Sequence, residues 1–72
     1  MTKVFLFMYL CSSLSGAVCK IIPTPVIMFN DMYDCTSYGY GYSHKMITSL
    51  ERDFVNDMGA YFKFMCEYKE IV

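Results

Sequence analysis

The chain has 72 residues, a formal net charge of −1, and a composition that is 56% hydrophobic and 18% aromatic. This length allows one small domain, and a domain of this size buries little core and usually needs an additional constraint such as a disulfide. No basic surplus exists, so nucleic-acid binding has no electrostatic support.

The first 17 residues have the three-part layout of a secretory signal peptide. Met1-Thr2-Lys3 is a positive start, Val4–Cys11 is an apolar run, and residues 12–17 are small and polar. Ser15 and Ala17 occupy the small-residue positions before a cleavage site. We therefore expect residues 1–17 to form a signal helix that is removed, which leaves a small exported domain over residues 18–72.

Two alternatives stay open for this segment, an uncleaved membrane anchor and a buried core helix. The apolar run is far shorter than the roughly 20 residues that a spanning helix needs, which favours a cleaved signal. A lipidated Cys19 is disfavoured, because a lipidation site requires a leucine-like residue at the position of Gly16 and a small residue at that of Val18.

Export implies an oxidising compartment in which cysteines pair. After cleavage the chain would keep Cys19, Cys35 and Cys66. Because three is an odd number, one thiol would be free or would pair with another chain.

The first part of the expected domain is extended. A β-branched segment predicts a strand at about 19–22, and Pro23 and Pro25 then make residues 22–25 an extended connector. The apolar residues 26–29 either dock on the core or form a short strand. Asn30-Asp31 is a helix N-cap signal.

A long helix is predicted at about 31–53. Apolar and small residues recur every three or four positions, as expected for one helix face: Met32, Cys35, Gly39, Tyr42, Met46 and Leu50. Gly39 lies within this face, where a missing side chain allows close approach, whereas Gly41 is only a weak point that costs about 1 kcal/mol relative to alanine. Gly59 suits a left-handed C-cap, so the helix should end between about Arg52 and Met58.

A second strand is predicted at about 60–68. Alternation places four residues on its buried face: Phe62, Phe64, Cys66 and Tyr68. Cys35 and Cys66 thus face one core from two elements and are candidates for a disulfide that closes a loop of about 31 residues, worth on the order of 3–4 kcal/mol. The expected fold is α+β, with an N-terminal signal helix, a short strand, one long helix and a C-terminal strand packed on it, stapled by this disulfide.

Four short motifs occur in order along the chain: Tyr33-Asp34-Cys35, Gly39-Tyr40, Val55-Asn56 and Phe64-Met65-Cys66. In this arrangement the chain resembles a group of very short, signal-bearing, uncharacterised proteins of marine bacteriophages and related metagenomic sequences. The resemblance implies a phage-encoded protein exported across the inner membrane of a bacterial host, with Cys35 and Cys66 as the recurring pair, and it implies no activity. Gly41 and the crowded tyrosines depart from the more charged helix of that group.

The sequence offers little chemistry. His44 is the single histidine, and on the predicted helix it points away from the apolar face, so we expect a solvated side chain and no enzyme. A zinc site is disfavoured, because no paired ligand motif exists and His44 lies nearly opposite Cys35. No phosphate-binding glycine loop is present, and no cofactor is expected.

Tyr33, Tyr40 and Ile47 follow one another at seven-residue spacing on the outer side of the predicted helix. Exposed aromatic rows can be recognition surfaces, so this row is a candidate partner surface. We therefore expect a binding or accessory protein of unknown protein target, periplasmic or extracellular, without nucleic acid. The alternative is a tiny membrane-anchored envelope or lysis-associated protein that contacts the membrane through an uncleaved N-terminal helix.

Overall fold

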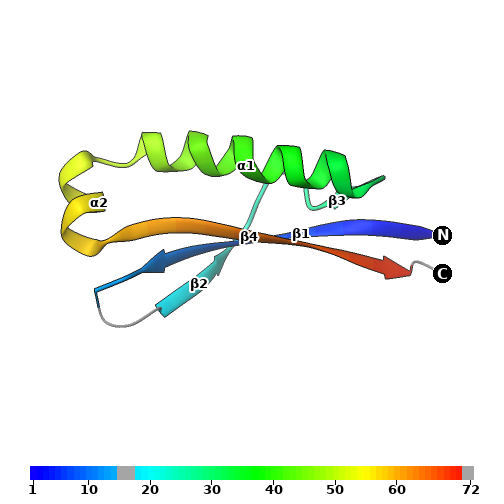
Figure 1. The fold of residues 1–72 in the computed structure, drawn as a ribbon, viewed down its shortest axis with the longest axis horizontal. Coiled ribbons are helices and arrows are strands. Elements are labelled where there is room, and N and C mark those ends of the chain that lie inside the picture. The colour runs from blue at the N-terminus through cyan, green and yellow to red at the C-terminus, as the bar shows by residue number, and fades with distance from the viewer. Residues whose placement is uncertain (15–17, 71–72) are drawn as a thin grey trace.

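The computed structural model describes residues 1–14 and 18–70. Its elements in chain order are β1 (Thr2–Ser12), β2 (Val18–Ile22), β3 (Met28–Phe29), α1 (Met32–Ser49), α2 (Arg52–Met58) and β4 (Ala60–Glu70). The four strands form one antiparallel sheet, and α1 lies along one side of it (Figure 1). The protein is therefore a small α+β fold.

The expected N-terminal signal helix is wrong, because the first segment is strand β1 from Thr2 onward. A short, continuous apolar run is typical of a signal sequence and equally of a strand buried on both faces. Here Val4, Leu6 and Met8 are buried on one face, and Phe5 and Phe7 are half-buried on the other. The buried core helix is wrong for the same reason. The proposed cleavage positions, Ser15 and Ala17, lie outside the described residues.

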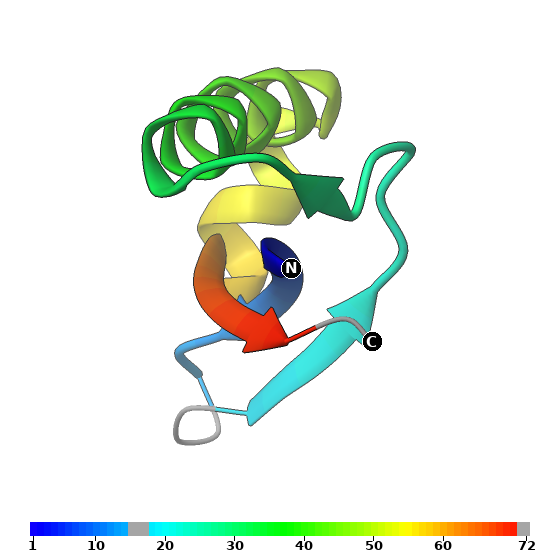
Figure 2. The ribbon, with the colours of Figure 1, turned by 90° about the vertical axis from the view of Figure 1, so that its right-hand side faces the viewer.

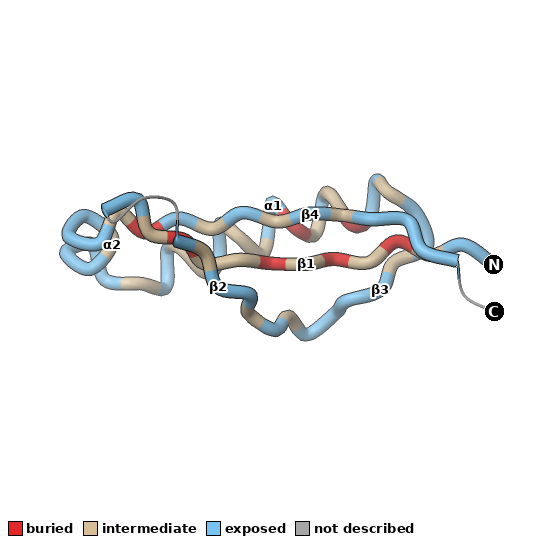
Figure 3. Tube along the Cα trace, turned by 90° about the horizontal axis from the view of Figure 1, so that it is seen from below, coloured by how far each residue is buried: buried red, intermediate tan, exposed pale blue. Residues whose placement is uncertain are grey.

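Strand β1 is the centre of the sheet. It pairs with β4 along its whole length, from Thr2 opposite Glu70 to Ser12 opposite Ala60. Its other edge is shared by β2, which pairs with residues 8–12, and by β3, which pairs with residues 4–5. Figure 3 shows β1 lying between β4 and the β2–β3 side, with the buried positions concentrated along it. The two strands that the sequence predicts at about 19–22 and 60–68 are not neighbours, because this N-terminal segment lies between them.

The long helix begins as the sequence predicted. The Asp31 carboxylate accepts a hydrogen bond from the Asp34 backbone N–H at 2.8 Å, which caps the first turn. The predicted single helix over 31–53 is interrupted, however, because Leu50 adopts extended backbone geometry, and α2 then begins at Arg52. Gly59 ends α2 in the left-handed conformation, as its position after Met58 indicated.

The core lies between α1 and the inner face of the sheet. Val4, Leu6 and Cys35 form its buried centre. Half-buried apolar residues surround this centre: Phe29, Met32, Tyr38, Phe64 and Cys66. Gly39 is buried against the Phe64 ring, in which a Cβ atom would sit. The missing side chain therefore sets how closely α1 approaches β4.

Candidate functional site: the open face of the sheet

The sheet has one face that α1 covers and one face that no described helix covers (Figure 2). Paired residues in antiparallel strands point to the same side, so the register identifies the residues of this uncovered side, which we call the open face. They are Lys3, Phe5, Phe7, Tyr9 and Cys11 of β1, Cys19 and Ile21 of β2, Met28 of β3, and Tyr61, Lys63, Met65, Glu67 and Lys69 of β4.

Aromatic rings and lysines interleave on the open face. The Lys69 ammonium lies 5.2 Å from the centroid of the Phe7 ring and 5.8 Å from that of Phe5, and the Lys63 ammonium lies 5.8 Å from that of Tyr9. These are cation–π distances, worth about 0.5–1 kcal/mol at exposed sites. The lysines therefore cover part of the aromatic row while their charges stay accessible to solvent.

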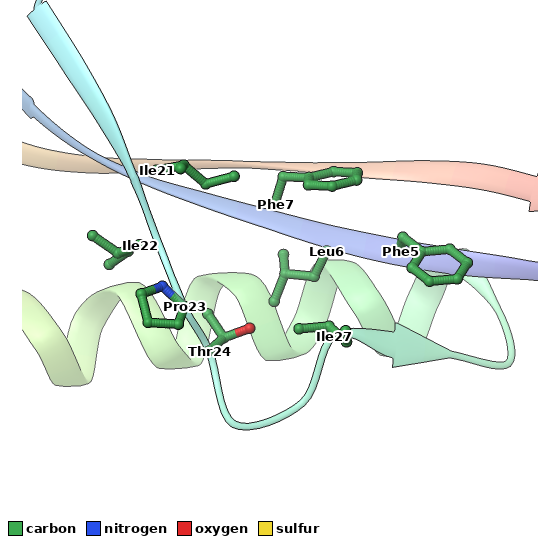
Figure 4. A pocket seen from close by; sticks show the side chains of 8 residues that line it. All are labelled: Phe5, Leu6, Phe7, Ile21, Ile22, Pro23, Thr24 and Ile27. Carbon is green, nitrogen blue, oxygen red and sulfur yellow. The ribbon is translucent and has the colours of Figure 1, made fainter.

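Beside this row the sheet is hollowed between β2 and β3. A groove of about 380 Å³ opens where the chain leaves β2 at Pro23 and returns as β3. Its lining is apolar except for Thr24 (Figure 4): Phe5, Leu6, Phe7, Ile21, Ile22, Pro23, Thr24 and Ile27. The Leu6 backbone N–H donates to the Ile27 carbonyl at 2.9 Å, which anchors the far wall of the groove to β1.

The end of the open face is fixed by a disulfide between Cys11 and Cys19. The two residues are paired across β1 and β2, and their Cα atoms are 4.1 Å apart. Cys19, which the sequence indicated as a free or intermolecular thiol, is therefore bonded within the chain. The error follows directly from assigning Cys11 to a signal peptide.

The predicted disulfide between Cys35 and Cys66 is present, with Cα atoms 6.2 Å apart. It joins the first turn of α1 to the middle of β4 on the covered face. All four cysteines are thus paired, which fits an oxidising compartment.

The candidate helix row lies elsewhere, on the flank of α1 above β4. Tyr33 is 79% exposed and Tyr40 69% exposed, whereas Ile47 is half-buried. The Tyr40 ring meets the Phe64 ring edge-on, with centroids 4.9 Å apart. The row is therefore a real surface feature, although it faces the edge of the sheet and does not contribute to the open face.

His44 is exposed, and no group of three or more potential metal-ligating side chains occurs in residues 1–14 and 18–70. Hydrogen bonds from the Met1 ammonium and from the Thr2 hydroxyl lower the pKa of the fully exposed Glu70 carboxyl. Neither α1 nor α2 is long and apolar enough to cross a membrane.

Comparisons with protein-family models, with curated proteins and with solved structures find no match to this chain. The interpretation of its surfaces therefore depends on their geometry and chemistry.

The sequence analysis did not identify the open face, because its β1 residues belong to the segment interpreted as a signal peptide: Lys3, Phe5, Phe7, Tyr9 and Cys11. Alternation within that run could have indicated a strand. Phe5, Phe7 and Tyr9 would lie on one face of such a strand, and Val4, Leu6 and Met8 on the other. Both sets are apolar, so periodicity alone could not distinguish a central strand from an export sequence.

Proposed function

We propose that this chain is a small binding or accessory protein of an oxidising compartment and that the open face is its binding surface. The observation that carries the proposal is the half-buried row of Phe5, Phe7 and Tyr9, which no described helix covers. The exposed Ile21 and Met65 lie beside these half-buried rings and extend the apolar surface. Contiguous apolar surface on a small protein marks an interaction site, and aromatic residues are enriched in such interfaces.

The charges on the open face suggest the chemistry of the partner. Lys63 and Lys69 lie over the aromatic rings, while Glu67 is the acidic residue on this face of β4. A ligand that buries the rings would also bring its own groups close to the two ammonium ions. This surface suits a segment of a partner protein that combines apolar and acidic side chains.

The disulfides support the proposed location in an oxidising compartment. Two disulfides in so short a chain are typical of secreted domains, and export to a periplasm or to the extracellular space would supply the oxidising conditions. The resemblance to phage-encoded proteins suggests action in a bacterial envelope. In every case export has to leave residues 2–12 in place, because they form the centre of the sheet.

Panning a random peptide library against the oxidised full chain tests the proposal. We expect the recovered peptides to be rich in aromatic or aliphatic residues together with Asp and Glu. Binding of a recovered peptide should weaken at least about tenfold in Phe7→Ser, which removes an aromatic anchor, and in Lys69→Glu, which reverses a charge without touching the core. The matched control, Tyr33→Ser, changes the exposed flank of α1 and should bind normally.

Two outcomes would contradict the proposal. Binding that is lost in Tyr33→Ser and retained in both open-face variants would move the binding surface to the helix row. Selective binding of a single-stranded oligonucleotide in place of peptides would indicate that the lysines and rings serve as a stacking platform for bases, which is a different class of partner.

A further inference from the structure

The outer edge of β4 is a long strand edge with no partner among the described residues. β4 runs over Ala60–Glu70 and pairs with β1 on one side only. A free edge presents a row of unpaired backbone N–H and C=O groups that can bind another strand. No proline or bulge interrupts this strand, so the whole edge is available for pairing.

The hydrogen bonds identify which residues point their backbone groups outward. The Ser13 N–H donates to the Gly59 carbonyl in the same register as the β1–β4 ladder, whereas the Leu6 N–H donates to Ile27 on the opposite side of β1. Because antiparallel pairs alternate, odd-numbered residues of β4 bond to β1. The even-numbered residues therefore direct their N–H and C=O groups to the free edge: Phe62, Phe64, Cys66 and Tyr68.

The side chains of β4 are complementary to a second copy of β4 in one antiparallel register. When Met65 lies opposite Met65 of another copy, Lys63 of each chain lies opposite Glu67 of the other, and Tyr61 lies opposite Lys69. On the covered face, Phe62 then meets Tyr68 and Phe64 meets Cys66. Opposite charges or apolar groups are thus matched at every position from 62 to 68, and an aromatic ring faces an ammonium group at 61 and 69.

Neighbouring registers lose this match. Centring the pairing on Lys63 or on Glu67 places like charges directly opposite each other, and centring it on Cys66 places Lys63 opposite Lys69. Centring it on Phe64 avoids like charges but loses both Lys63–Glu67 pairs, because Lys63 then faces Met65 and Glu67 faces Tyr61. Like charges directly opposite destabilise a strand pair. The charge pattern therefore selects the Met65 register.

The flank of α1 shows the same symmetry. Cys35 of α1 is bonded to Cys66 and Gly39 lies against Phe64, so Met65 is level with about residue 37 of the helix. Tyr33 and Tyr40 lie about one helical turn to either side of that level. A two-fold axis through Met65 and perpendicular to the sheet puts the two α1 helices on the same face and antiparallel. Tyr33 of each chain then lies near Tyr40 of the other.

We propose that the partner of this edge is a second copy of the chain, and that two β4 strands pair antiparallel about Met65 to form one continuous sheet. A shallow hollow already lies between α1 and β4 along this edge, lined by Thr36, Tyr40, Ser43, Phe62, Lys63 and Phe64. Pairing covers it with the flank of the other helix and joins the two open faces side by side.

Sedimentation velocity of the oxidised full chain over a range of concentrations tests the dimer. Lys63→Glu alone and Glu67→Lys alone each replace both attractive pairs with repulsive ones, and each should weaken dimerisation at least about tenfold. The double variant K63E/E67K restores opposite charges across the axis and should dimerise like the original chain. Lys20→Glu makes the same charge change on β2, far from this edge, and should have no effect.

Cysteine cross-linking tests the register. Met65→Cys places two thiols opposite each other at the axis and should give a covalent dimer on non-reducing gels, whereas Tyr68→Cys, whose own copy lies far away, should not. We expect a dimer dissociation constant of about 0.1 μM or less. A chain that is still monomeric at about 100 μM, roughly a thousand times that value, would overturn the proposal. So would a dimer that Lys63→Glu leaves intact or a double variant that fails to recover. Ile21→Ser changes the open face on β2, which β1 separates from β4, and should leave dimerisation unaltered, so this result is independent of peptide binding by the open face.

Discussion

Gly39 and Gly41 are two residues apart in α1 and meet opposite surroundings. Gly39 is buried, and a Cβ atom there would enter the Phe64 ring, whereas nothing lies within 4 Å of a Cβ atom at Gly41. The sequence predicted this difference, because Gly39 belongs to the apolar face of the helix and Gly41 to the opposite one. The segment Tyr38–Tyr42 contains both glycines and by composition resembles a flexible linker. It is a regular part of α1, in which packing requires Gly39.

We expect Gly39→Ala and Gly41→Ala to change stability in opposite directions. Gly39→Ala must displace the Phe64 ring and should lower the free energy of unfolding by about 1–3 kcal/mol. Gly41→Ala adds helix propensity in open space and should raise it by about 0.5–1 kcal/mol. Thermal and urea unfolding of the two variants measure this, and equal effects would contradict the packing role of Gly39.

At the scale of the elements, the two disulfides constrain different parts of the chain. The Cys11–Cys19 bond joins neighbouring strands with a sequence separation of 8, whereas the Cys35–Cys66 bond joins α1 to β4 with a separation of 31. The longer loop restricts the unfolded chain more strongly. Only the second bond holds the helix on the sheet.

Removing each bond by paired serine substitutions should therefore have unequal effects. The chain-entropy account gives about 3.7 kcal/mol for the Cys35–Cys66 bond and about 2.5 kcal/mol for the Cys11–Cys19 bond. Urea unfolding of C35S/C66S and of C11S/C19S measures the two losses. A larger loss in C11S/C19S would show that the β1–β2 connection, and not the contact between helix and sheet, limits stability.

At the scale of the whole molecule, β1 is the element on which the fold depends. It contributes Val4 and Leu6 to the centre of the core and pairs with each of the other three strands. Without β1, the strands β2, β3 and β4 have no common neighbour, and α1 loses its contacts with Val4 and Leu6 in the core. Every strand pairing of the described sheet includes β1, so no two of the remaining strands are paired without it.

A chain that begins at Val18 should therefore fail to fold. We expect it to show the narrow amide proton dispersion of an unfolded polypeptide in an NMR spectrum, whereas the full chain shows a dispersed one. A chain lacking only Met1, which leaves β1 intact, is the matched control. A well-dispersed spectrum from the Val18 chain would restore the interpretation of residues 1–17 as a removable segment.

Local patterns in the sequence were sufficient for several features. The Asp31 cap, the left-handed Gly59, the inward position of Gly39 and the Cys35–Cys66 pair all follow from helix periodicity, strand alternation or the geometry of single residues. Each depends on contacts near in sequence, or on which face of an element a side chain occupies. Such information is present in the order of the residues.

The tertiary structure decided the role of the first twelve residues, and with it the open face and the partner of Cys19. A short apolar run has the same composition whether it crosses a translocon or fills the middle of a sheet, and the difference lies in what packs around it. Here β4 closes one edge of the run, β2 and β3 share the other, and α1 covers its inner face. These neighbours are far apart in the chain, so no local pattern could specify them.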